Sequence, residues 1–176
     1  NAWETTKARG EYKNGAMRVV LPRYTQLDQL ANKSLGHMLV ACTCALLAGV
    51  KPESKQFRAL QTFFRHFLIA KQLNDDAHDW QEDLNNGHLS VVVTLILRRS
   101  GLKHFNTAQD LPALQRIFWE HTVDEVSRLI TRHCDLAELA IADIEPVNPK
   151  IFYDLLDPHR RAAQKASETK QAVQSF

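Results

Sequence analysis

The sequence predicts an all-α protein, a bundle of long helices. Apolar residues recur at intervals of three and four along most of the chain, which is the period of a helix with one buried face. The central segment 54–84 contains no glycine or proline, so nothing interrupts a helix there. Residues 17–21 could form a short extended run, and 89–97 has the β-branched composition of a strand but no second strand to pair with it. A helical bundle is therefore the expected architecture.

Length and composition narrow the class of protein. The 176 residues suffice for one domain, and a net charge of +2 with 24% charged residues implies no polyanionic partner. No helix carries basic residues interleaved with aromatics, so we expect no nucleic-acid binding. The three cysteines have no framework spacing, which indicates reduced thiols in a cytoplasmic protein. No apolar run reaches the ~18 residues of a membrane span, and no signal-peptide pattern opens the chain.

The first half of the chain has two expected parts before the central helix. Turn residues and weak periodicity mark 1–23 as a connecting segment that enters a helical domain over 24–176. Apolar spacing predicts a helix over 24–48, which Gly49 and Pro52 end. Cys42 and Cys44 lie two residues apart in it, point to different faces and are expected to be small core residues.

The second half is expected to be helical throughout. Ser54 is a good N-cap for a helix that runs to about Leu84, and 85–87, Asn-Asn-Gly, ends it. Since 89–97 has no partner strand, we predict a buried helix there. Helical periodicity also predicts helices over 110–144, with a proline in its first turn, and over about 150–173.

Several carboxylates project from one face of the predicted central helix. At about 100° per residue, one narrow stripe contains Arg65, Gln72, Asp76, Asp79 and Asp83, and Asp75 flanks it. A solvated acidic face is one explanation, because like charges one turn apart repel by only ~0.2–0.5 kcal/mol. A metal site is the other, because aromatic and aliphatic neighbours indicate burial, where clustered carboxylates need a cation. Oxygen ligands on a rigid helix suit Mg²⁺.

The same segment resembles the second aspartate-rich motif of the trans-prenyl diphosphate synthases, which are class I isoprenoid synthases. The agreement extends from Ala70 to Ser90. Its first part is carried by Gln72, Asp75, Asp76 and Asp79, and its second part by Asp83, Leu84, Gly87 and Ser90. The segment is also similar to the motif of the squalene and phytoene synthases, through Asp79, Glu82, Asp83 and Gly87.

The resemblance implies a function. Asp75, Asp76 and Asp79 would hold Mg²⁺, with Glu82 and Asp83 as possible additional ligands. Lys33 and Ser34 stand where the family has a Lys-Thr pair. Lys33 would therefore bind the substrate diphosphate, and Ser34 would help to position it. Gln72 would lie at the active end of the cavity. The implied reaction ionises an allylic prenyl diphosphate and condenses the carbocation with isopentenyl diphosphate.

The sequence departs from the family pattern in three places. His88 stands where the family has a lysine at the diphosphate, which removes a fixed cation. The spacer between Asp79 and Asp83 is shorter than in chain-elongating synthases and closer to the squalene and phytoene type. Only one of the family's two aspartate-rich motifs is present. We therefore expect this chain to be the C-terminal half of a synthase, an incomplete bundle whose first motif lies upstream or in a partner chain; a homo-oligomer is also possible.

Three functions remain open from the sequence. The first is a prenyl diphosphate synthase. The second is a terpene cyclase or a head-to-head synthase with the same ionisation chemistry. The third is a non-catalytic helical subunit that only binds or regulates a catalytic partner.

Overall fold

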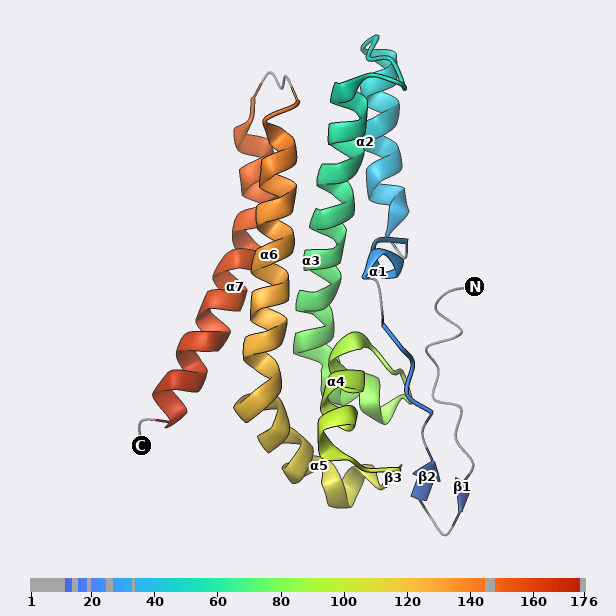
Figure 1. The fold of residues 1–176 in the computed structure, drawn as a ribbon, viewed down its shortest axis with the longest axis vertical. Helices are drawn as coiled ribbons and strands as arrows, with labels where there is room; N and C mark the ends of the chain where they lie inside the picture. Colours follow the sequence, from blue (N-terminus) through green and yellow to red (C-terminus); the bar gives the residue numbers. More distant parts are fainter. Residues whose placement is uncertain are drawn as a thin grey trace.

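The computed structural model describes residues 12–13, 16–18, 20–24, 27–32, 34–144 and 148–174. It confirms the all-α prediction (Figure 1). The helices are α1 (Asp28–Asn32), α2 (Leu35–Leu47), α3 (Lys55–Asn85), α4 (Val91–Ser100), α5 (Thr107–Ile117), α6 (Val123–Ile141) and α7 (Lys150–Gln174), with a π-helical turn η2 (Phe118–Thr122) between α5 and α6. A small antiparallel sheet in the order β1-β2-β3 joins Tyr12–Lys13, Ala16–Arg18 and His104–Phe105.

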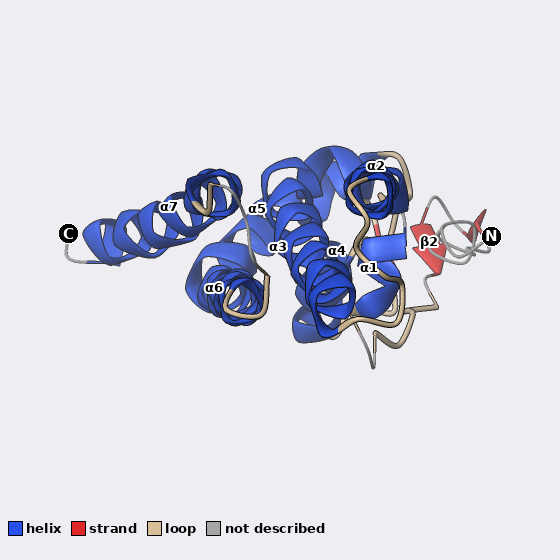
Figure 2. Cartoon of the chain, turned by 90° about the horizontal axis from the view of Figure 1, so that it is seen from above, coloured by secondary structure: helices blue, strands red, loops and turns tan. Residues whose placement is uncertain are grey.

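Helix α3 is the centre of the molecule. Seen along the bundle, α6 and α7 lie on one side of it and α1 and α2 on the other (Figure 2). Ser54 Oγ accepts a hydrogen bond from Phe57 N at 3.1 Å, and Gly87, with φ of 68°, follows the helix end. Both ends of the predicted helix are therefore confirmed. Its fully buried residues include Phe63, Leu68 and Leu73, and the helix contacts α1, α2, α4, α6 and α7.

The expected single helix over 24–48 is wrong. The structure has two shorter helices, α1 and α2, and residues 20–24 are not helical. Tertiary hydrogen bonds explain the extended course of this segment: Tyr24 Oη donates to the Leu89 carbonyl at 2.6 Å, and Arg98 donates to the Pro22 carbonyl at 3.2 Å. Apolar spacing could not reveal these contacts, because both partners lie in or beside α4.

Helix α4 confirms the helical interpretation of the β-branched run. Ser90 Oγ accepts from Val93 N at 3.4 Å and Gly101, with φ of 66°, ends the helix. All three consecutive valines at its start are buried. Burial on several sides therefore overrides the strand propensity of valine.

The predicted helix over 110–144 begins earlier and is interrupted. Asn106 caps α5 by accepting from Ala108 N at 3.1 Å, so Pro112 lies inside α5 instead of in its first turn. The π-helical turn η2 then joins α5 to α6, and the pattern of apolar residues gave no sign of it. Helix α7 agrees with the prediction for the last segment.

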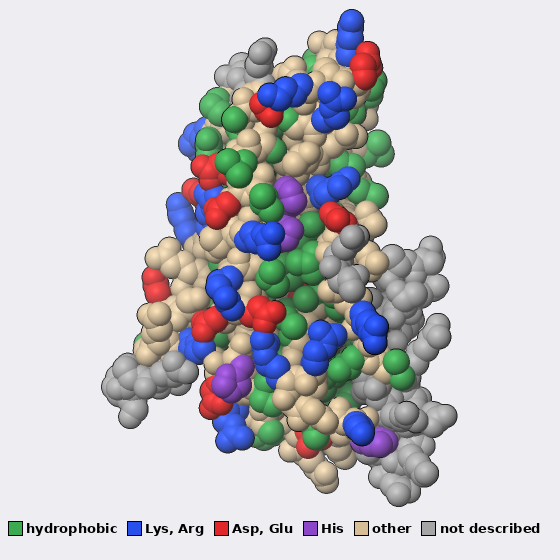
Figure 3. All heavy atoms as spheres, viewed as in Figure 1, with side chains coloured by type: hydrophobic (Ala, Val, Ile, Leu, Met, Phe, Trp, Pro, Cys, Tyr) green, Lys and Arg blue, Asp and Glu red, His purple; other side chains and the backbone are tan. Residues whose placement is uncertain are grey.

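Helix α2 exposes much of its apolar surface. Leu39 is 66% exposed and Leu47 84% exposed, and no Asp, Glu, Lys or Arg occurs between 34 and 50. Cys42 is buried as expected, but Cys44 is exposed, so the core prediction is wrong for Cys44. No described helix has the length and apolar character needed to cross a membrane. On the face shown in Figure 3, acidic and basic side chains are intermixed.

The large core predicts a clear contrast between two leucines. Leu73→Ala should lower the free energy of unfolding by about 2–5 kcal/mol, because it leaves a cavity at a fully buried position. Leu39→Ala, on the exposed face of α2, should change it by less than about 0.5 kcal/mol. Urea denaturation of both variants checks this, and equal losses would contradict the described packing.

Two histidines meet where α3 packs on α6. The Nδ1 atoms of His66 and His133 are 3.0 Å apart, so one donates and the other accepts. Burial, then His66 and Arg132, lower the pKa of His133 from 6.5 to about 4. Burial also lowers the pKa of His66, against the opposing charge of Asp28. The folded protein therefore favours the neutral form of both imidazole rings.

The lowered pKa values of His66 and His133 determine how the stability of the protein depends on pH. Between about pH 6.5 and 4 the unfolded chain binds more protons at these positions than the folded chain, so stability should fall as pH falls. We expect a loss of roughly 1 kcal/mol, since both rings are partly exposed and solvent screens the effect. Urea denaturation across this range should show that His133→Gln reduces the slope, whereas the exposed control His78→Gln keeps it. A His133→Gln slope equal to that of the wild type would refute the assignment.

Candidate functional site

The acidic stripe forms where the last turns of α3 meet α4. Asp76 is its buried member, 3% exposed. Its Oδ1 accepts from Gln72 Nε2 at 2.7 Å, and its Oδ2 accepts from Val91 N at 3.3 Å. Val91 is the first residue of α4, so the carboxylate lies at the positive end of that helix dipole. Asp76 therefore joins α3 to α4.

Tyr24 covers the same junction. Burial and the carboxylates of Asp76 and Asp83 all raise the pKa of Tyr24, so its hydroxyl stays protonated and donates to the Leu89 carbonyl. Asp83 Oδ1 accepts from His88 Nδ1 at 2.9 Å. The histidine in the family's lysine position is thus hydrogen-bonded to a carboxylate at the end of α3.

Other members of the stripe face outward. Asp75 is 43% exposed, and its Oδ2 is 2.9 Å from Lys71 Nζ, one turn earlier on α3. Asp79 and Glu82 are exposed. Asp75 and Asp79 are separated by one turn, so their side chains are neighbours on the helix surface, with Cβ atoms roughly 5–6 Å apart. The stripe is therefore neither wholly buried nor wholly solvated.

The outer carboxylates can be compared with what a metal site requires. In the described part of the chain, no group of three or more His, Cys, Asp and Glu side chains is arranged to hold a metal ion. Mg²⁺ needs no such group when substrate phosphates and water complete its shell, because one or two carboxylates then suffice. Asp75 and Asp79 supply hard oxygen donors of that kind. A Mg²⁺ site here therefore stays a prediction, and it would need substrate and water oxygens to complete its shell.

Of the predicted diphosphate ligands, Ser34 lies at the start of α2 and His88 follows the end of α3. Lys33 lies outside the described residues. Ser34 precedes α2, and its side chain makes no capping hydrogen bond there. Since α2 and α3 are consecutive helices joined by a short turn, Ser34 is about 20 Å and Asp75 about 30 Å from that turn along the axes. Ser34 and Asp75 thus differ by about 10 Å in their positions along the helix axes.

The structure also adds a residue that sequence reasoning missed. His159 of α7 packs its ring 5.7 Å from that of Phe67, and its buried Nδ1 has no hydrogen-bond partner among the described residues. Burial lowers the pKa of His159, while the charge of Asp75 raises it and that of Lys71 lowers it. His159 is distant from the motif in sequence, and no spacing could have identified it.

The buried and exposed aspartates should behave differently. Asp76→Ala should lower the free energy of unfolding by about 1–3 kcal/mol, because it leaves Val91 N and Gln72 without their acceptor. Asp79→Ala should change it by less than about 0.5 kcal/mol, because Asp79 is exposed. Urea denaturation in metal-free buffer checks both values. An Asp79→Ala loss as large as that of Asp76→Ala would contradict the division of the stripe.

The chain has been compared with protein-family models, curated proteins and solved structures. No family model matches it, and no match is found among the curated proteins or the solved structures. Its likeness to the isoprenoid synthases is therefore one of motif residues.

Proposed function

We propose that this chain supplies the C-terminal half of a class I isoprenoid synthase and that the end of α3 binds Mg²⁺ and a substrate diphosphate. The observation that carries the proposal is the division of the acidic stripe. Asp76 is fixed in the helix junction by two hydrogen bonds, while Asp75 and Asp79 stay accessible one turn apart. The hydrogen bonds of Asp76 hold this part of α3 in place, and the helix therefore presents the carboxylates of Asp75 and Asp79 in fixed positions.

Each residue has a role in this proposal. Bound Mg²⁺ would offset the charge that develops on the departing diphosphate. Asp75 and Asp79 are the ligands from this chain, Gln72 keeps Asp76 in place, and Lys33 with Ser34 contacts the diphosphate. Two further roles stay predictions. One is metal coordination by Asp76, Glu82 and Asp83, and the other is binding of the diphosphate by His88.

The reaction breaks the allylic C–O bond, and the diphosphate leaves with the electron pair. The double bond of isopentenyl diphosphate then attacks the carbocation to form a C–C bond. Loss of a proton from a neighbouring carbon restores a double bond. An apolar enclosure must keep water from the carbocation, and the side chain of Asp75 is 43% exposed, so the proposal requires a second half or a partner chain to complete that enclosure.

The exposed apolar face of α2 is consistent with a missing half of the synthase that packs against it. Leu39 and Leu47 lie on a helix without a charged side chain, beside the helix that carries the stripe. Exposed apolar patches of this kind mark interaction surfaces. We propose that the half bearing the first aspartate-rich motif, upstream or in a partner chain, covers this face. A second copy of this chain is the alternative occupant.

One observation favours a different function. Asp75 is paired with Lys71, and Asp76 is engaged in the helix junction, so both aspartates of the Asp-Asp pair have partners within the described chain. A non-catalytic subunit that keeps the fold would have the same features. This subunit is our second candidate.

The test is Mg²⁺-dependent release of pyrophosphate by the full-length gene product together with any partner chain. Asp75→Ala should lower the rate by roughly 100-fold or more, since an electrostatic contact to the leaving group is lost. Asp154→Ala is the matched control, because Asp154 is also paired with a lysine one turn earlier, Lys150, but on α7. Calorimetric titration of pyrophosphate with Mg²⁺ measures binding separately from turnover.

The substrates distinguish the candidate functions. Release only when an allylic diphosphate and isopentenyl diphosphate are both present indicates chain elongation. Release from the allylic diphosphate alone indicates a cyclase or a head-to-head synthase. If there is no release, and Asp75→Ala binds pyrophosphate as the wild type does, the non-catalytic subunit is the correct assignment.

A further inference from the structure

We infer that the cavity between α3, η2, α6 and α7, which is partly open to solvent, is a binding site for a small apolar anion, independent of the acidic stripe. Its volume is about 460 Å³, within the range of about 300–1,000 Å³ typical of ligand pockets. On α3 it is lined by Asn74, Ala77, His78, Trp80 and Gln81. At about 100° per residue, all of these positions except Trp80 lie on the other side of α3 from the stripe, and Trp80 lies on the flank between the two.

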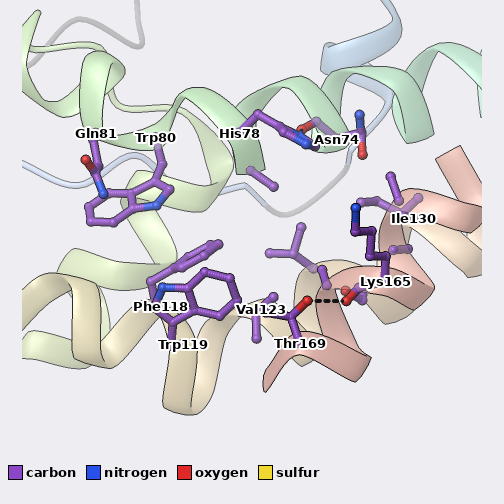
Figure 4. Close-up of a pocket in the computed structure, with 16 residues that line it drawn as sticks. Asn74, His78, Trp80, Gln81, Phe118, Trp119, Val123, Ile130, Lys165 and Thr169 are labelled. Atoms are coloured by element: carbon purple, nitrogen blue, oxygen red, sulfur yellow. Dashed lines mark hydrogen bonds between the residues drawn. The ribbon is translucent and has the colours of Figure 1, made fainter. Parts of the chain in front are cut away.

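Aromatic side chains form one end of the cavity (Figure 4). Trp80, 3% exposed, stacks on Phe118 with ring centroids 5.4 Å apart. Trp119, 42% exposed, meets Phe118 edge to face at 5.2 Å. Consecutive residues of an α-helix point about 100° apart. Phe118 and Trp119 are consecutive and both line the cavity, and both lie in the π-helical turn. Such turns often occur at functional sites.

The aromatic wall is fixed in place by hydrogen bonds around η2. Thr122 Oγ1 donates to the Ile117 carbonyl at 3.2 Å and accepts from Arg99 at 3.0 Å. Lys170 of α7 donates to the Glu120 carbonyl at 2.7 Å and is paired with Asp124. The turn is thus held from α4 and from α7. A preformed wall lowers the ordering cost of binding.

Small residues on α7 leave the space open. Ala162, Ala163 and Ala166 line the cavity from α7. A larger side chain at these positions would occupy volume that a ligand could take. The open space therefore depends on a specific choice of residues on α7.

The other end of the cavity is cationic and polar. Lys165 extends toward Asn74 and His78, away from Trp80 and Phe118 (Figure 4). No aspartate or glutamate lines the cavity, and Lys165 has no ion pair with another described residue. A cationic ligand would be repelled there, and a doubly charged phosphate would find only one lysine. The lining thus fits an aromatic or aliphatic body with one anionic group, a carboxylate or sulfonate.

The test uses 8-anilinonaphthalene-1-sulfonate as the probe, with 1-anilinonaphthalene as its uncharged counterpart. We expect saturable one-to-one binding of the sulfonate, detected by energy transfer from the tryptophans. Lys165→Gln should weaken it by roughly three- to tenfold, the size expected for one partly exposed charged contact, and Lys165→Arg should restore it. Lys103→Gln, an exposed lysine outside the cavity, is the matched control.

Two further variants locate the probe. Ala166→Leu fills the cavity and should abolish binding, whereas Leu39→Ser alters the exposed face of α2 and should leave binding unchanged. The inference is overturned if binding does not saturate or if Lys165→Gln binds like Lys103→Gln. It is also overturned if the uncharged compound binds as tightly as the sulfonate, or if Leu39→Ser is the variant that loses binding. Asp75→Ala should not affect this binding, so failure here leaves the proposed function standing.

Discussion

Burial of α3 on several sides is the constraint on which the rest of the structure depends. The 31 residues of this helix contact α1, α2, α4, α6 and α7, so each of its faces has a different environment. Residues such as Phe63 and Leu73 are fully buried and hold the helix in one orientation. Because the helical period then fixes every other position, this orientation also determines which carboxylates reach solvent.

The two candidate sites follow from that one orientation. Toward α4, α3 presents Asp76 to the first turn of the next helix, where two hydrogen bonds and the helix dipole stabilise a buried charge. Toward η2, it presents Trp80 to Phe118 and closes an aromatic wall. The polar junction supports an outer pair of carboxylates, and the aromatic junction supports a cavity. A single rigid helix thus separates two chemically different environments.

The sequence predicted the features that depend on local chemistry. Ser54 and Gly87 act at the ends of their own helix, so α3 was predicted almost to the residue. Features set by distant partners could not be predicted. Tyr24 is held by a carbonyl beside α4, which breaks the expected helix over 24–48, and His159 of α7 packs against Phe67 of α3. Periodicity placed Asp76 on the stripe but could not distinguish it from its exposed neighbours, because that depends on Val91.

The most direct measurement is a crystal structure of the full-length protein, with any partner chain, soaked with Mn²⁺ and pyrophosphate. Anomalous scattering locates the metal without reference to activity. Our account predicts a peak at roughly 2.1–2.3 Å from carboxylate oxygens of Asp75 or Asp79, with pyrophosphate completing the shell. A fully bound pyrophosphate whose metal lies away from both residues, or no metal at the end of α3 under saturating conditions, would contradict it.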